Sequence, residues 1–191
     1  MAEEKLIADS EYEVLSRNAL TIFAIRCAQR VLPLIDHCAP NTDASVRQLL
    51  DTSLESAANA AMTDTRLAKF TTHMTGLGAI KLKSYAQSTS EESHSNHLLS
   101  CASIVVACVG HAISTAEEPL YPGFEIKQAR NSSDSSVVAC EAISPECQDM
   151  CVLACKHDFE RLKTTNCLGK FDLSTFGPLW PDGVPNGWPE T

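Results

Sequence analysis

Aromatic side chains and positive charge are scarce in this sequence. Only 6% of its 191 residues are Phe, Trp or Tyr, and much of the 44% apolar fraction is Ala, Leu and Ile. Small and unbranched apolar residues favour the helical state and suit close helix packing. Lys and Arg total 15 against 24 Asp and Glu, which gives a formal net charge of −9. A nucleic-acid partner requires a basic face, so this composition argues against one.

Long apolar runs are also missing. The best candidate, Ile104 to Val109, is far too short to span a membrane. The opening Met1 to Lys5 is acidic and precedes no apolar run of the kind that a signal peptide contains. The nine cysteines are an odd number, which a disulfide framework would leave unpaired. We therefore expect no membrane span, a cytoplasmic location and free thiols in a reducing compartment.

Sequence signatures of catalysis are absent as well. The chain has no Gly-x-Ser-x-Gly nucleophile motif and no Gly-x-x-x-x-Gly-Lys phosphate loop. Nor does it have the Cys-x-x-Cys pairs that mark most structural zinc sites. These absences favour a protein that is not an enzyme, although a site assembled from scattered residues stays open.

What the sequence does contain is helical periodicity, interrupted by proline and serine. No alternation of polar and apolar residues lasts long enough to predict a strand. We predict an all-α fold, an irregular bundle of about five or six helices over residues 1–170. We expect one helix from an N-cap at Ser10 to Ile35 that Pro33 kinks or ends, and one from a cap at Asn41 or Thr42 to Ala61. Two more are expected over 64–85 and over about 92–114. The last is expected over 137–163, where the Ser-rich cluster 131–136 caps it and Pro145 divides it.

The C-terminal segment, residues 171–191, has a different composition. It carries four prolines, three glycines and both tryptophans of the chain, so we expect it to be extended. Its large apolar side chains would form an exposed patch if the segment were free, so we expect them to dock. The docking surface is either the chain's own helices or a partner protein. The expected contact residues are Phe176, Leu179, Trp180 and Trp188.

Cysteines recur on one face of the last predicted helix. Cys147, Cys151 and Cys155 are spaced by four residues, and His157 follows. This set could hold zinc through thiolate and imidazole, or act as a thiol redox sensor. Alternatively, the cysteines are small buried residues that let helices approach closely. We favour packing and expect no cofactor, with zinc as the alternative.

Two short stretches resemble known sequences. Residues 23–34, Phe-Ala-Ile-Arg-Cys-Ala-Gln-Arg-Val-Leu-Pro-Leu, contain an Arg-Cys-Ala-x-Arg-Val-x-Pro-Leu run, and residues 176–183, Phe-Gly-Pro-Leu-Trp-Pro-Asp-Gly, contain a Gly-Pro-Leu-Trp-Pro-x-Gly run. Both are similar to segments of uncharacterised bacterial helical proteins. The resemblance implies a bacterial origin and a helical body, and it carries no known activity.

Arg26 and Arg30 lie four residues apart within the first of these runs, between apolar neighbours. We expect their stems to lie along the bundle while their guanidinium groups reach carboxylates, with Asp36 or Asp43 as partners. An anion-binding pair is the alternative.

Together these features favour a helical protein–protein interaction module, an adaptor or regulatory subunit of a bacterial multi-protein system, with another protein as its partner. Two alternatives stay open. One is a zinc-binding or thiol redox-sensing protein that uses the cysteine and histidine residues, and the other is an enzyme with scattered site residues.

Overall fold

The computed structural model describes residues 6–40, 42–67, 93–165 and 176–189. Within these ranges the ordered elements are helices, and Leu67 and Glu117 form an isolated bridge rather than a strand. The predicted all-α irregular bundle is therefore confirmed, whereas the helix predicted over 64–85 lies mostly outside the described residues. The helices are α1 (Asp9–Tyr12), α2 (Arg17–Val31), α3 (Leu34–Cys38), α4 (Ala44–Met62), α6 (Ser93–Ala116), α7 (Phe124–Glu141) and α8 (Pro145–Thr164).

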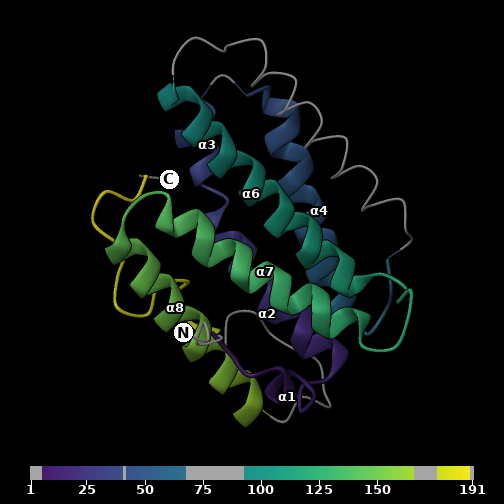
Figure 1. The fold of residues 1–191 in the computed structure, drawn as a ribbon. Coiled ribbons are helices and arrows are strands. Elements are labelled where there is room, and N and C mark those ends of the chain that lie inside the picture. The colour runs from purple at the N-terminus through teal and green to yellow at the C-terminus, as the bar shows by residue number, and fades with distance from the viewer. Residues whose placement is uncertain (1–5, 41, 68–92, 166–175, 190–191) are drawn as a thin grey trace.

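Helix α2 is the centre of the bundle. It contacts α4, α6, α7 and α8 (Figure 1), and every residue from Ala19 to Ala28 is buried. A helix that is surrounded in this way is usually apolar on all sides, and the sequence of α2 is so around Phe23. Arg26 and Arg30 are its two buried charged residues. In Figure 1, α4 lies along one side of α6, while α8 and the yellow C-terminal segment lie at the other end of the molecule.

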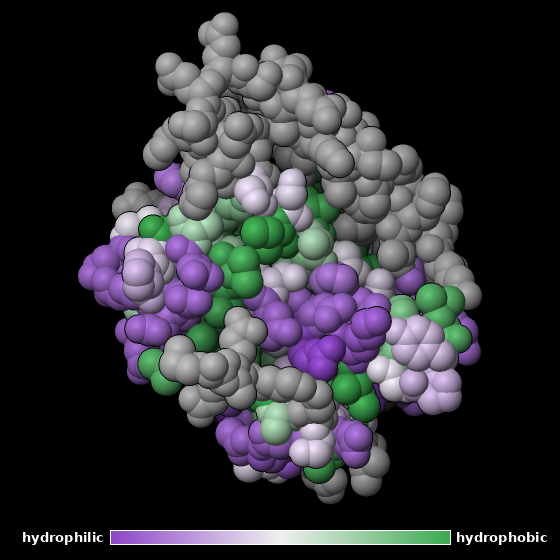
Figure 2. Space-filling model, viewed as in Figure 1, coloured by the Kyte–Doolittle hydropathy of each residue, from purple (hydrophilic) through white to green (hydrophobic). Residues whose placement is uncertain are grey.

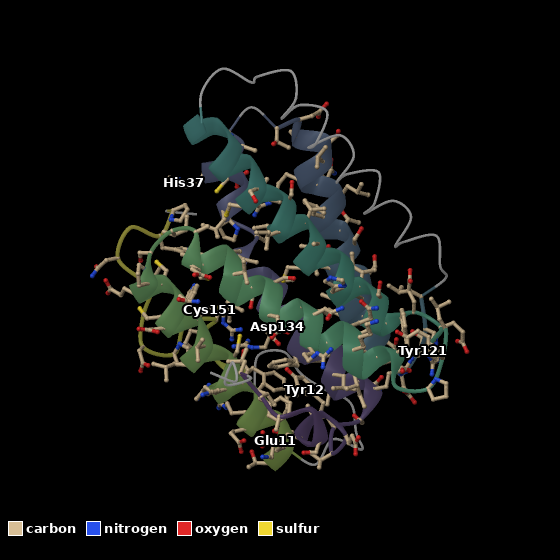
Figure 3. The ribbon with its side chains drawn as sticks, in the orientation of Figure 1. Glu11, Tyr12, His37, Tyr121, Asp134 and Cys151 are labelled. Atoms are coloured by element: carbon tan, nitrogen blue, oxygen red, sulfur yellow. The ribbon has the colours of Figure 1, made fainter. Side chains whose placement is uncertain are left out.

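Three aromatic residues pack together where α1, α2 and α8 meet. The rings of Tyr12, Phe23 and Phe159 pack edge to face, with centroids 5.2 to 6.0 Å apart. Figure 3 shows Tyr12 turned into the bundle, where its hydroxyl lies 3.1 Å from Ser133 Oγ on α7. Edge-to-face packing is the arrangement that aromatic quadrupoles favour, and a buried tyrosine needs such a hydrogen-bond partner. This cluster fixes α8 against α2.

The start of α7 differs from the prediction. The Ser-rich cluster 131–136 does not cap a helix at residue 137, because α7 begins at Phe124, after Gly123 with a φ of 79°. Ser132, Ser133 and Ser136 are instead buried inside the helix. Their hydroxyls donate to main-chain carbonyls, and Ser132 Oγ reaches Ala24 O of α2 at 3.0 Å. A serine whose hydroxyl bonds a carbonyl carries no unsatisfied donor, so it is tolerated within a helix and allows close packing.

Two predicted N-caps are also wrong by a few residues. Ser10 lies within the short α1, and Ser16 caps α2 by accepting a hydrogen bond from Ala19 N at 3.2 Å. Asp43, rather than Asn41 or Thr42, caps α4 through Ser45 N at 2.8 Å. All these residue types can cap a helix, so composition alone does not choose among neighbours.

Both predicted proline effects are confirmed. Helix α2 ends at Val31, and Pro33 precedes α3 as its N-cap residue. Pro145 is the first residue of α8 and separates it from α7, with Ser144 as the cap. Proline suits the first turn of a helix, because the N–H that it lacks would have no partner there.

The surface is mixed in character. On the face shown in Figure 2, apolar side chains gather over the C-terminal half of α7 where it meets α6, and polar side chains cover the middle of α7. Among the described helices, none has the length and apolar character that crossing a membrane requires.

Candidate functional site

A buried group of three charged residues lies where α2 and α8 meet. Arg26 and Arg30 stand one turn apart on α2, and both bond the same oxygen of Asp158 on α8. Arg26 Nε lies 2.8 Å from Asp158 Oδ2, and Arg30 Nη2 pairs with that atom as well. Asp158 and Arg30 are fully buried, and Arg26 is 4% exposed. Two guanidinium groups and one carboxylate leave this group with a formal charge of +1.

The same two arginines hold the C-terminal segment through its main chain. Arg26 donates to the carbonyls of Gly177 and Pro178 at 3.3 and 2.9 Å, and Arg30 Nε donates to Leu179 O at 2.7 Å. One pair of arginines therefore binds three successive main-chain carbonyls of the C-terminal segment. The planar guanidinium offers several donors in a fixed fork, and this suits it to bridging a carboxylate and a peptide backbone.

The partners of the arginines differ from those predicted. Asp36 instead pairs with Arg47, at 2.7 Å, and Asp43 caps α4. Arg26 and Arg30 point toward α8 and the tail, which are more than 120 residues away in sequence. Sequence proximity suggested the two aspartates, but the direction in which a helix face points depends on the whole packing of the bundle.

The tail, defined here as Phe176–Pro189, lies against the bundle. Phe176 is 1% exposed, and its ring lies 5.6 Å from the Arg26 guanidinium carbon. Trp180 and Trp188 are also buried, and their rings meet edge to face at 4.9 Å. Leu179 is partly buried against the core. In this structure the four predicted contact residues therefore dock on the chain's own helices.

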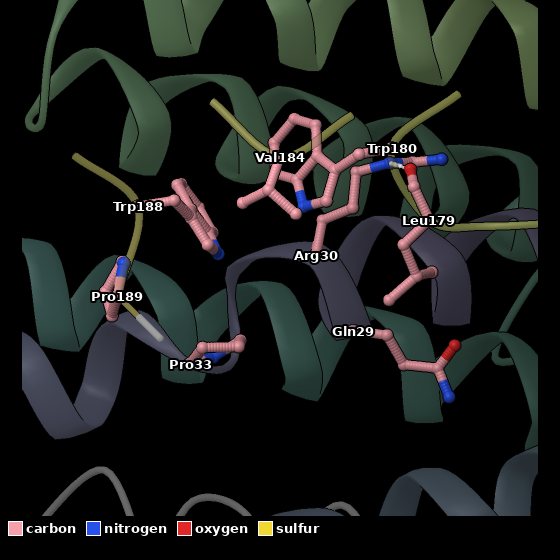
Figure 4. Close-up of a pocket in the computed structure, with 8 residues that line it drawn as sticks. All are labelled: Gln29, Arg30, Pro33, Leu179, Trp180, Val184, Trp188 and Pro189. Atoms are coloured by element: carbon pink, nitrogen blue, oxygen red, sulfur yellow. Dashed lines mark hydrogen bonds between the residues drawn. The ribbon is translucent and has the colours of Figure 1, made fainter. Parts of the chain in front are cut away.

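A pocket of about 560 Å³ lies between the tail and α2 (Figure 4). Its tail side is formed by Trp180, Val184 and Trp188, and its helix side by Gln29, Arg30 and Pro33. The pocket is mostly apolar, and the donors of Arg30 are directed to Leu179 O, Ala154 O and Asp158. The pocket therefore suits an apolar or planar group. It does not suit an anion, because the Arg30 donors already have partners.

Cysteine thiols lie against the Arg30 guanidinium group. Cys27 Sγ on α2 lies 3.6 Å from Cys155 Sγ on α8, and Arg30 Nη1 lies 3.6 Å from Cys155 Sγ. Hydrogen bonds from the thiols of Cys151 and Cys27, with the charge of Arg30, hold the pKa of Cys155 well below its ordinary value. Burial raises the pKa of the Cys27 thiol. Of the two thiols that Arg30 contacts, Cys155 is therefore the one that more readily becomes a thiolate.

The four predicted metal-ligating residues have different surroundings. The Cys151 thiol donates to Ser136 Oγ at 3.6 Å, Cys155 Sγ lies 3.6 Å from Cys27 Sγ, and Figure 3 places Cys151 between α7 and α8. Cys147 Sγ points to the tail, 3.8 Å from Asn186 O. His157 is 43% exposed, and its Nδ1 lies 3.9 Å from Asp158 Oδ1. Within the described ranges, no three His, Cys, Asp or Glu residues form a group that could hold a metal ion.

Sequence reasoning missed Asp158, which is the anchor of the site. It lies in a charged stretch of α8, Lys-His-Asp-Phe-Glu-Arg, where any carboxylate could face solvent. The one available signal was the preceding four-residue spacing of Cys147, Cys151 and Cys155, because a helix face that contains them also lies close to residue 158. Compared with models of protein families, with curated proteins and with solved structures, the chain matches none.

Proposed function

We propose that this chain is a non-enzymatic helical interaction module that recognises an extended peptide segment, and that its own tail is the resident occupant of the recognition site. A segment of another protein with the same chemistry, an extended backbone with prolines and a large aromatic side chain, takes the place of the tail. Such a module serves as an adaptor or regulatory subunit of a bacterial multi-protein system.

The observation that carries this proposal is the hold of Arg26 and Arg30 on three successive tail carbonyls. In peptide recognition, main-chain hydrogen bonds supply affinity without regard to sequence, and pockets for side chains supply specificity. The arginine pair has the first role, and the docked rings of Phe176, Trp180 and Trp188 have the second. Trp and Arg are also the residues that dominate the energetics of protein interfaces.

The anchoring of the arginines supports a preformed site. Asp158 bonds both guanidinium groups through nitrogens other than those that bind the tail, so the arginines need little reorganisation to bind a backbone. Preorganisation of this kind raises affinity by lowering the entropy lost on binding. The neighbouring pocket supports the proposal further, because the docked tail leaves a space beside Trp180 and Trp188 that an additional side chain could enter.

The test is peptide exchange in a chain that folds with its tail attached. A protease recognition sequence is placed between residues 165 and 176, and the purified protein is then cut. A fluorescently labelled peptide of residues 176–191 is added, and its anisotropy is followed. We expect saturable binding that unlabelled peptide reverses, because the cut tail leaves and the labelled copy takes its place.

The matched control is a peptide in which Trp180 and Trp188 are alanine. We expect this peptide to bind at least tenfold more weakly, since both rings are buried in the docked tail. Two results would contradict the proposal. One is loss of helical circular dichroism after cutting, and the other is a cut tail that never exchanges, because either would make the tail a permanent part of the core.

A further inference from the structure

We propose that Cys27 and Cys155 are a redox-active pair that a peroxide converts into a disulfide, and that this oxidation loosens the hold of Arg30 on the tail. The first part stands on the geometry of the thiols. The second part rests on the function proposed above, since it makes the tail a releasable occupant.

The two sulfurs lie in direct contact. They belong to different helices and are 3.6 Å apart, and both are fully buried. A disulfide requires about 2 Å between sulfurs. A side-chain rotation and a small approach of α8 toward α2 would supply the remaining distance. The aromatic cluster of Tyr12, Phe23 and Phe159 holds the same two helices together nearby.

The charges around Cys155 favour its thiolate. Arg26, Arg30 and Asp158 together leave one positive charge in a fully buried setting, and a thiolate at Cys155 balances it. The other groups that face this sulfur are neutral donors: the thiols of Cys27 and Cys151, and the Ser136 hydroxyl 3.7 Å away. A buried charge is stable when it is paired and hydrogen-bonded, and Cys155 has both kinds of partner.

Other thiol pairs lack this combination of a sulfur–sulfur contact between two helices and an adjacent guanidinium group. Cys151 and Cys155 are four residues apart on one helix, where Cβ atoms stand about 5–6 Å apart, more than a disulfide permits. The Cys151 thiol instead donates to Ser136 Oγ at 3.6 Å, and the Cys101 thiol to Ala139 O at 3.7 Å. A guanidinium contact to a thiol is present at Cys155 and Cys27, through Arg30 Nη1. The contact to Cys155 is the shorter of the two, which makes Cys155 the attacking sulfur.

The pocket beside the tail is the described cavity from which a small oxidant would approach this sulfur. Arg30 lines the pocket beneath Trp180 and Trp188, and the same guanidinium contacts Cys155 on its inner side. Arg30, which lines the pocket in Figure 4, is therefore the side chain that lies between the pocket and the Cys155 sulfur. Hydrogen peroxide is small enough to enter it, and transient lifting of the tail would widen the path.

The reaction balances in two steps. The Cys155 thiolate attacks one peroxide oxygen, the O–O bond breaks, and hydroxide leaves while Cys155 becomes a sulfenic acid. The Cys27 sulfur then attacks the sulfenic sulfur, the S–O bond breaks, and the disulfide forms. Overall, two thiols and one hydrogen peroxide give one disulfide and two waters. The peroxide is reduced, and each sulfur loses one electron.

Oxidation removes the negative charge that Arg30 faces. The group then holds two guanidiniums against one carboxylate, with no thiolate to balance the second, so Arg30 is drawn toward solvent. Because Arg30 Nε bonds Leu179 O, that movement weakens the docked tail. Oxidation of Cys155 is thereby coupled to release of the tail.

The experiment uses the full-length protein treated with one equivalent of hydrogen peroxide, then denatured and alkylated. Digestion with trypsin and chymotrypsin should yield a linked pair of peptides, residues 27–30 joined to residues 154–156. The intact mass should fall by two hydrogens. Cys155→Ser and Cys155→Ala should both abolish the link, and the matched variant Cys140→Ser should keep it.

A disulfide at Cys38–Cys101 or Cys140–Cys151, or no disulfide at all, would overturn the redox pair. The cut protein with its labelled tail peptide tests the coupling, and we expect at least tenfold faster peptide release after oxidation. An unchanged release rate with the disulfide present would overturn the coupling alone. If the peptide fails to bind the reduced protein, the proposed function fails while the mapped disulfide still stands.

Discussion

At the scale of single residues, Asp158 is the most consequential side chain in the molecule. Its Oδ2 atom receives both guanidiniums, while Oδ1 is buried and has no hydrogen-bond partner among the described residues. His157 Nδ1 lies 3.9 Å from Oδ1. Removing one member of a buried charged group is costlier than removing the whole group, because the remaining charges stay buried without a partner.

We therefore predict that Asp158→Asn lowers the free energy of unfolding by about 3–5 kcal/mol, since two arginines lose their shared carboxylate. Urea denaturation followed by circular dichroism measures this. The matched control is Glu160→Gln on the same helix, where an exposed carboxylate pairs with Lys163 at 2.9 Å. That change should alter the unfolding free energy by less than about 1 kcal/mol. Equal effects of the two substitutions would contradict this account of the buried group.

At the scale of helices, the structure and the sequence pattern place the N-cap of the first long helix at different serines, and substitutions can decide between them. Ser16→Ala removes the acceptor for Ala19 N, and we expect it to destabilise the fold by about 1 kcal/mol. Ser10, the cap that the sequence predicted, is exposed within α1. Ser10→Ala should therefore change the thermal midpoint little. A larger effect at Ser10 than at Ser16 would place the helix start where the sequence pattern had it.

Helices and their interruptions follow from local chemistry, and this is why they could be predicted. Apolar periodicity marks the burial of α2, and Pro33 and Pro145 separate helices because proline lacks an N–H. The serines of α7 misled the prediction, because serine favours caps in isolation. Within α7 the bundle supplies carbonyls such as Ala24 O to satisfy the buried hydroxyl of Ser132.

The site could be predicted only in part. The spacing of Arg26 and Arg30 and the apolar tail were visible in the sequence, and each pointed to a contact. The contact between them was not visible, because it joins residues about 150 positions apart through main-chain carbonyls that no side-chain pattern encodes. The cysteine pattern on α8 likewise gave no sign that Cys27 of α2 lies opposite Cys155.

At the scale of the whole molecule, buried thiols make stability sensitive to alkali. Burial raises the pKa of Cys108 to about 12, against an ordinary value of 9. Below pH 9 the thiol is protonated in both the folded and unfolded chain, so its contribution to stability is complete. Between pH 9 and 12 the unfolded chain loses this proton and the folded chain keeps it, so stability falls as the pH rises.

We predict that the free energy of unfolding declines from pH 9 upward. Cys108→Ala should make this decline shallower by roughly 1 kcal/mol per pH unit. Urea titrations at several pH values between 8 and 11 measure both slopes. Ala at this position keeps an apolar group and removes the ionisable one. Identical slopes for the parent and the variant would show that the buried Cys108 thiol does not titrate on unfolding.

The contact between the arginine pair and the tail also has a consequence for how the chain is made. Helix α2 is synthesised long before Asp158 and the carbonyls of Gly177, Pro178 and Leu179, which lie 132 to 152 residues downstream of Arg26 and 128 to 149 downstream of Arg30. Until those residues leave the ribosome, both guanidiniums have only water to bond, and burying them would be costly. The core around α2 therefore closes only after α8 and the tail have emerged, and shorter nascent chains keep this face hydrated.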